Sequence, residues 1–167
     1  MRVAGGSNDE LASRVTTHLL ALAKGSDDPV NMYISSPGVH VESGDMVHDM
    51  IKFIRPKVRT IGSGWVASAG ALIFVGADRA DRYCLPNTRF MIHQPLGGFH
   101  GQASDIDIHA KEILLIRDRL NKIMASHTGQ PLDVIQGDTD RDNFMGSQQA
   151  VEYGLIDQVL KTRNIEE

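Results

Sequence analysis

The chain has 167 residues, of which 41% are hydrophobic and 23% are charged, and its formal net charge is −4 with histidine neutral. This length suits one domain with a real core, and the interspersed acids and bases offer no basic block for a nucleic-acid partner. The single cysteine, Cys84, rules out an internal disulfide and fits a reducing compartment. The first residues lack an apolar signal core, and the uncharged stretch 61–77 is too short for a membrane span, so we expect a cytoplasmic protein without membrane contact.

The first half of the chain alternates between helix-like and strand-like patterns. Asn8 is placed to cap a helix whose apolar residues recur at helical spacing. The segment 30–35 predicts a strand, and a short helix that Pro56 stops follows it. The segment 58–62 predicts a second strand. After a flexible turn, the apolar segment around Ser68 predicts a buried helix.

The second half continues this alternation. Strands are expected at 82–85 and 89–93, and a long helix at 103–127. Pro131 opens another short helix, and a helix at 147–153 ends at Gly154 before a last strand at 155–160. Strands separated by helices predict an α/β fold with a mainly parallel sheet.

The predicted long helix carries more apolar surface than one buried face needs. It contains no Pro or Gly and is roughly 36 Å long at about 1.5 Å per residue. One stripe consists of Ile106, Ile113, Ile116, Leu120 and Ile123, and further apolar residues widen it. We expect a second face to be buried on another subunit; the alternative is a central core helix.

Ser68 is the one hydroxyl within an apolar run, "ASAGALIFVGAD", and it has two interpretations. At a helix start, unpaired N–H groups and the helix dipole stabilise an anion, which suits a nucleophile. Alternatively, Ser68 caps the helix or fills the core. The nucleophile-elbow pattern G-x-S-x-G is absent because Val66 replaces its first glycine.

Candidate partners for Ser68 are few. His93 closes an apolar strand before a Pro/Gly loop, where α/β sheets present functional groups. The other histidines on predicted helices are interpreted as surface residues: His18, His48, His109 and His127. Asp138, Asp140 and Asp142 share one loop, and spacing alone does not choose an orienting acid among them. Metal and nucleotide motifs are absent, so we expect no metal site and no cofactor.

Five segments together resemble the proteolytic subunit of Clp proteases: "ASAGALIFVGAD", "RYCLPNTRFMIHQPLGG", "GQASDIDIHAKEIL", "HTGQPLDVIQGDTDRDNFM" and "AVEYGLIDQVL". The resemblance runs from about residue 9 to 164 with order and spacing kept. It implies a crotonase-like α/β fold in which residues 1–167 form one proteolytic domain. Residues 1–96 and 129–167 would form its head, and about 97–128 a protruding long-helix handle.

The resemblance implies a serine endopeptidase. Ser68 matches the family nucleophile, His93 the general base and Asp142 the acid. The backbone N–H groups of Val39 and Ala69 match the oxyanion hole. Substrate would lie extended between two segments, along the substrate-binding residues Gly38, Val39, Pro95, Leu96 and Gly97.

The family also implies partners. Identical subunits form two stacked seven-membered rings around a closed chamber. An AAA+ unfoldase ATPase feeds unfolded polypeptide into it, and ATP does not bind the proteolytic chain. The ring–ring contact would involve the interface residues Gly98, Phe99, Gln102, Ile113 and Ile116.

Two departures from the family pattern stand at the expected site. Val39 replaces the second glycine of S-P-G-G, and a β-branched residue is disfavoured at positive φ. We expect its N–H to be misaimed, unless φ is negative there. Ala69 stands where the family usually has Met, which predicts a wider pocket. Two alternatives therefore stand beside the peptidase: a catalytically weak subunit with mainly an assembly role, favoured by Val39, and a crotonase-type acyl-CoA enzyme, which needs no matched Ser and His.

Overall fold

The computed structural model describes residues 1–6, 8–38, 40–95 and 102–161. Its helices are α1 (Asp9–Gly25), α2 (Val41–Phe53), α3 (Ala69–Phe74), α4 (Ala103–Thr128), α5 (Leu132–Asp138) and α6 (Ser147–Tyr153). Its strands are β1 (Arg2–Ala4), β2 (Val30–Ser36), β3 (Val58–Ala67), β4 (Arg82–Cys84), β5 (Arg89–Ile92), β6 (Asn143–Gly146) and β7 (Gln158–Val159). None of the helices within these ranges has the length and apolar character that crossing a membrane requires.

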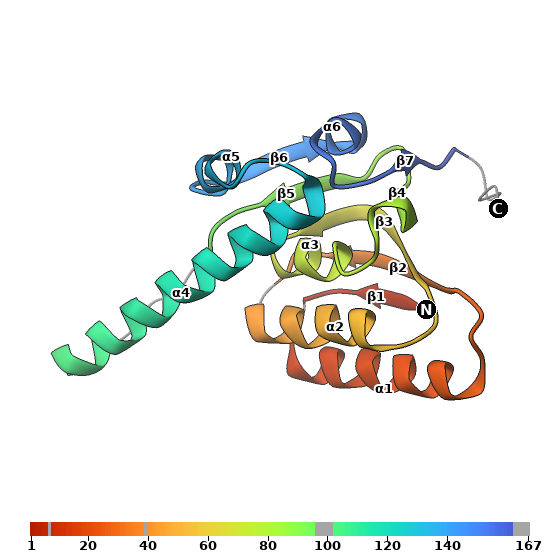
Figure 1. The fold of residues 1–167 in the computed structure, drawn as a ribbon, viewed down its shortest axis with the longest axis horizontal. Coiled ribbons are helices and arrows are strands. Elements are labelled where there is room, and N and C mark those ends of the chain that lie inside the picture. Colours follow the sequence, from red (N-terminus) through yellow and green to blue (C-terminus); the bar gives the residue numbers. More distant parts are fainter. Residues whose placement is uncertain (7, 39, 96–101, 162–167) are drawn as a thin grey trace.

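All the strands belong to one sheet, and β3 is its central member. The order β1-β2-β3-β4-β7 is parallel throughout, which confirms the predicted parallel α/β arrangement. Along one edge, β3 pairs with β4 through its first half and with β5 through its second half. The last strand in space, β6, runs antiparallel to β5. Helices α1, α2 and α3 lie together beside this sheet, with α5 and α6 on the side of β5 and β6 (Figure 1).

The core follows from the strand and helix periodicities. Along β2, Val30, Met32 and Ile34 are buried while Asn31 and Tyr33 are exposed, as alternation in a half-covered strand requires. Helix α1 buries Ala12, Val15 and Leu19, which recur at helical spacing on one of its faces. Its predicted cap is confirmed, because the Leu11 N–H donates to Asn8 Oδ1 at 2.9 Å.

The structure corrects three predicted elements. The strand expected at 58–62 continues to Ala67, so the predicted flexible turn is wrong: Gly64 adopts φ +71° and the register to β2 shifts there, which lets the chain stay extended. The buried helix after it is only Ala69–Phe74. The last strand is two residues long, and β6 was not predicted. The four residues of β6 include one buried side chain, Met145, so no apolar alternation marks this strand in the sequence.

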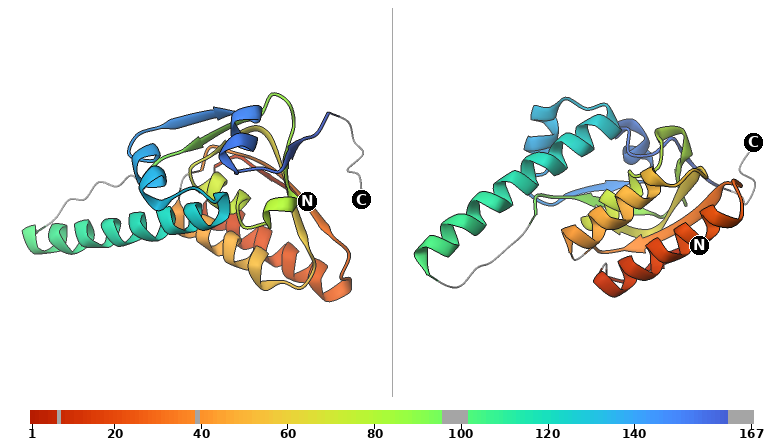
Figure 2. Two further views of the ribbon diagram at one scale, coloured as in Figure 1. Left: turned by 45° about the horizontal axis from the view of Figure 1, so that its top comes forward. Right: turned by 60° about the horizontal axis from the view of Figure 1, so that its bottom comes forward.

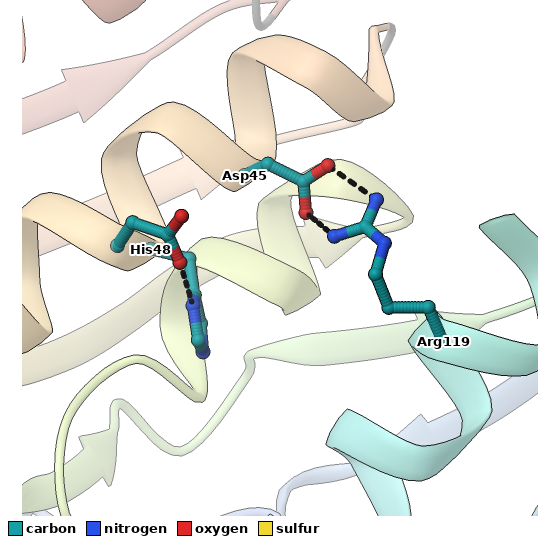
Figure 3. A network of polar contacts seen from close by, with 4 residues as sticks. Asp45, His48 and Arg119 are labelled. Atoms are coloured by element: carbon teal, nitrogen blue, oxygen red, sulfur yellow. Dashed lines mark hydrogen bonds and ion pairs between the residues drawn. The ribbon is translucent and has the colours of Figure 1, made fainter.

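Helix α4 confirms the predicted long helix and projects away from the other elements (Figures 1 and 2). Between Gln102 and Leu120 no residue is buried, and its exposed apolar side chains include Ile108, Leu114 and Leu115. Near its C-terminal end, Arg119 forms a bidentate ion pair with Asp45 of α2, at 2.6 and 2.7 Å (Figure 3). This pair attaches the base of α4 to the rest of the fold.

A second contact, made by a buried arginine, holds the C-terminal end of α4 against the sheet. Arg82 is 1% exposed, and its guanidinium donates to the carbonyls of Leu155 at 3.1 Å and His127 at 2.7 Å. Burial lowers the pKa of Arg82 to about 10, which leaves it protonated at neutral pH. One charged side chain therefore joins β4, the end of α4 and the loop before β7.

We predict that Arg82→Met lowers the free energy of unfolding by about 2–4 kcal/mol, because two buried carbonyls lose a charged donor. Urea denaturation followed by the fluorescence of Trp65 measures this loss. The exposed Arg79→Met is the matched control and should change stability by less than about 0.5 kcal/mol. Equal stability of the two variants would contradict the assigned role of Arg82.

Candidate active site

Ser68 lies at the sharp turn between β3 and α3, with φ 54° and ψ −124°. It is the one non-glycine residue in the described chain with positive φ, a conformation that costs of order 1–3 kcal/mol. Its N–H donates to Met91 O at 3.0 Å, and its carbonyl accepts from Ala71 and Leu72. Ser68 occupies the N-cap position of α3, but its side chain makes no capping hydrogen bond, so its hydroxyl does not serve as a cap. The turn has the shape of a nucleophile elbow although its sequence pattern is absent.

Strand register brings His93 to Ser68 and Asp142 to His93. Ala67 pairs with Met91, so the ends of β3 and β5 lie side by side. Ile92 pairs with Asn143 in the antiparallel ladder, which places His93 opposite Asp142. His93 Nε2 lies 2.7 Å from Ser68 Oγ, and its Nδ1 lies 3.3 Å from Asp142 Oδ1. The imidazole is 13% exposed and the carboxylate 58%.

The β2–α2 loop passes unusually close to the Ser68 turn. Gly38 has φ +69°, and a Cβ atom there would lie 2.5 Å from Ala69 N and 2.6 Å from Ala67 O. A Cβ on Gly70 would lie 2.9 Å from Ser36 O. The two backbones are therefore packed against each other without side chains. The Ala69 N–H, at the first turn of α3, has no acceptor within its own helix and is available to an anion.

A pocket opens beside Ser68 and His93, and its walls are largely apolar. Val41, Leu72, Ile92 and Met124 contribute aliphatic surface, and Ala69 lines the same pocket. The small Ala69 side chain leaves room there. Two buried polar residues also line it: Thr139 Oγ1 donates to Asn121 Oδ1 at 3.0 Å. The Asp45–Arg119 ion pair joins the two helices that carry Val41 and Met124.

Other polar candidates have different positions. Asp138 accepts from the Tyr153 hydroxyl at 2.8 Å. His48 is 7% exposed, so its assignment to the surface is wrong: its ring packs edge-on against His127 between α2 and α4. Burial lowers the pKa of His127 to about 4, which keeps it neutral at neutral pH. Burial raises the pKa of the Cys84 thiol to about 11, so it is no rival nucleophile.

The remaining predicted site residues divide into two groups. Pro95 lines the pocket, Gln102 is exposed before α4, and Ile113 and Ile116 are half-buried on that helix. Val39, Leu96, Gly97, Gly98 and Phe99 lie outside the described residues. Among the residues that are described, no cluster of three His, Cys, Asp or Glu side chains could hold a metal ion.

Gln94 is a site residue that the sequence analysis missed. Its N–H donates to Thr139 O at 2.6 Å, and its side-chain amide donates to Asp140 O at 2.8 Å. Arg117 of α4 donates to the Gln94 side-chain oxygen at 3.2 Å. Gln94 thus holds the loop that leads to Asp142 next to the end of β5, which His93 follows directly. Its place directly after His93 was the available signal.

Comparison with known proteins identifies the family that carries this geometry. The family model for Clp protease matches residues 1–163. The chain belongs to the Clp protease family. It is 61% identical over 160 residues to an ATP-dependent Clp protease proteolytic subunit of Paracoccus denitrificans, covering 96% of this chain and 80% of that protein. It is 56% identical over 161 residues to proteolytic subunit 3 of Rhizobium etli, covering 96% and 83%.

A solved structure supports the same assignment. A ClpP1 mutant from Listeria monocytogenes is 45% identical, has a TM-score of 0.92, and is matched over 98% of this chain and 91% of that chain. The expected crotonase-like α/β fold is confirmed. The chain is a serine endopeptidase of the Clp type, and the two alternatives, an acyl-CoA enzyme and a catalytically weak subunit with mainly an assembly role, are not favoured.

We predict that Gly38→Ala lowers kcat for a fluorogenic peptide by about a hundredfold, because the new methyl group would push the loop off the Ser68 turn. Peptide hydrolysis and circular dichroism separate this effect from unfolding. Gly25→Ala, with open space around its Cβ, is the matched control and should retain wild-type activity. Full activity of Gly38→Ala would refute the close-approach argument.

Proposed function

We propose that Ser68, His93 and Asp142 are the catalytic triad of this endopeptidase. The observation that carries the proposal is the 2.7 Å contact between His93 Nε2 and Ser68 Oγ at a strained turn. A hydroxyl in hydrogen-bond reach of an imidazole, which itself faces a carboxylate, has the arrangement of an activated nucleophile. The strained backbone of Ser68 supports the same role, because a serine that only filled the core would have no need of a strained conformation.

In the proposed reaction, Ser68 Oγ attacks the carbonyl carbon of the scissile peptide bond while His93 Nε2 takes its proton. The Ala69 N–H stabilises the oxyanion. The family's second donor is the backbone N–H at Val39, and the direction of that N–H decides how much it adds. His93 then protonates the leaving amine, and an acyl-enzyme on Ser68 remains. A water molecule, deprotonated by His93, hydrolyses this ester and restores Ser68. Asp142 holds the imidazole tautomer and stabilises the imidazolium.

Substrate recognition follows from the two flanking segments and the pocket. An extended polypeptide would pass between Gly38–Val39 and Pro95–Gly97, pairing through its main chain. Main-chain pairing suits unfolded substrates and makes selectivity weak. The aliphatic pocket beside Ser68 would take an apolar side chain, and Ala69 leaves it room for a large one.

We also propose that the chain works in an assembly of identical subunits in the cytoplasm, as two stacked seven-membered rings. The projecting α4 supports this, because its apolar side chains Ile108, Leu114 and Leu115 are 59–64% exposed. Gly98, Phe99, Gln102, Ile113 and Ile116 would contribute to the contact between rings. Residues 1–167 would then be one proteolytic domain, with 97–128 as its handle. The relatives named ATP-dependent support a separate AAA+ ATPase as unfoldase.

Removing the triad groups should give non-additive losses. We expect Ser68→Ala to abolish peptide hydrolysis with the assembly intact, and His93→Ala or Asp142→Asn each to remove most of the rate. Double variants should lose little more, because the three groups act as a unit. Steady-state kinetics with a fluorogenic peptide measures this. Near-wild-type activity of Ser68→Ala would end the triad proposal.

Charges placed on the handle should weaken the assembly. We expect Ile113→Lys or Ile116→Lys to reduce the assembled mass seen by light scattering, because a buried ammonium would lack a partner. Glu112→Lys changes charge on the same helix at an exposed site and is the matched control. A stable monomer for the unmodified chain at working concentration would contradict the proposal.

A further inference from the structure

Three side chains form a cluster across the three strands that lead to the triad. Trp65 lies on β3, Arg89 on β5 and Phe144 on β6. The Trp65 and Phe144 rings are 5.8 Å apart between centroids, and the Arg89 guanidinium lies 5.8 Å from the first and 5.3 Å from the second. The cation therefore contacts both rings, and the cluster bridges β3 to β6 across β5.

The cluster lies on the same face of the sheet as the proposed His93–Asp142 contact. Trp65 pairs with Arg89, and Phe144 pairs with Met91, two residues further along β5. Because side chains alternate along a strand, Arg89, Met91 and Phe144 lie on one face of the ladder. The same alternation, continued one residue past the paired Ile92 and Asn143, brings His93 and Asp142 to that face. Phe144 is therefore the next side chain on this face after Asp142.

Asp142 lies between two supports: the loop that Gln94 holds on one side, and the backbone of β6 on the other. Within the described chain, the one hydrogen-bond or ion-pair partner of its carboxylate is His93, and 58% of the side chain is exposed. The strand itself is four residues long and pairs with β5 alone. An edge strand with so few pairs frays readily unless side chains hold it.

We propose that the Trp65–Arg89–Phe144 cluster is a positioning device that holds β6, and with it Asp142, in register against His93. The proposal rests on the triad assigned above. Packing of two rings around one guanidinium resists sliding of β6 along β5 and lifting of β6 from the sheet. The cluster residues do not touch the reacting atoms; they act through Asp142.

The test is a double-mutant cycle between Phe144 and Asp142, read as kcat and KM for a fluorogenic peptide. Phe144→Ala should lower kcat about tenfold and leave KM within about twofold. This is less than the roughly hundredfold cost of moving a catalytic group by about an ångström, because β6 keeps its ladder bonds to β5. In the Asp142→Asn background the same substitution should cost nothing further. Phe144→Tyr, which keeps the ring, should retain wild-type kcat.

Two further variants keep the test decisive. Arg89→Gln removes the cation from an exposed site without a cavity and should lower kcat about threefold, again only when Asp142 is present. Trp65 is the single tryptophan, so its emission reports directly whether each variant changes the cluster. Phe53→Ala removes a 77% exposed ring from α2 and should leave both kcat and Trp65 emission unchanged.

Two results would overturn the inference: unchanged kcat in Phe144→Ala with altered Trp65 emission, or an equal loss in the Asp142→Asn background. The second result would mean that the cluster acts on the fold in general. Wild-type kcat in Asp142→Asn alone would instead refute the triad, so the two failures are distinguishable.

Discussion

The pairing of β5 with β3 on one side and β6 on the other is the constraint on which the site depends. The parallel register of β3 and β5 brings the strand ends of Ser68 and His93 together. The antiparallel register of β5 and β6 places Asp142 opposite His93. A slip of one residue in either ladder would turn the affected side chains to the other face. The candidate triad is therefore a property of two ladders, and no single motif creates it.

A second constraint is the absence of side chains where two backbones meet. Gly38 and Gly70 let the β2–α2 loop lie against the Ser68 turn, at distances that a Cβ would not allow. The strain at Ser68 is tolerated because its N–H and carbonyl both have partners and the turn is enclosed by buried elements. As a result, the Ser68 hydroxyl and the Ala69 N–H point to the same side of the turn. An anion formed on a group that Ser68 attacks would lie within reach of that N–H.

Much of this arrangement could be predicted from the sequence, and the reasons differ between elements. Helix α4 was predictable because no glycine or proline interrupts it. The end of α6 was predictable because Gly154 is the residue type that favours the left-handed conformation found there. Ser68 and His93 were recognisable as candidates from their apolar surroundings. The choice of Asp142 over Asp138 and Asp140 needed the resemblance, because β6 is too short for its pairing to be read from periodicity.

Burial of polar groups was the least predictable part. Arg82 and His48 are buried by tertiary contacts, which for both residues include His127 near the end of α4. The Gln94 bridge to residues 139 and 140 likewise joins segments far apart in the chain. Helical or strand periodicity reports which face is apolar. It carries no information on which distant carbonyl will accept a hydrogen bond.

The most direct measurement of the central claim is labelling with a fluorophosphonate, which reacts only with an activated serine, followed by peptide mass spectrometry. We expect one labelled residue, Ser68, and loss of labelling in His93→Ala although the serine is still present. Labelling at another serine, or undiminished labelling of Ser68 without His93, would contradict it.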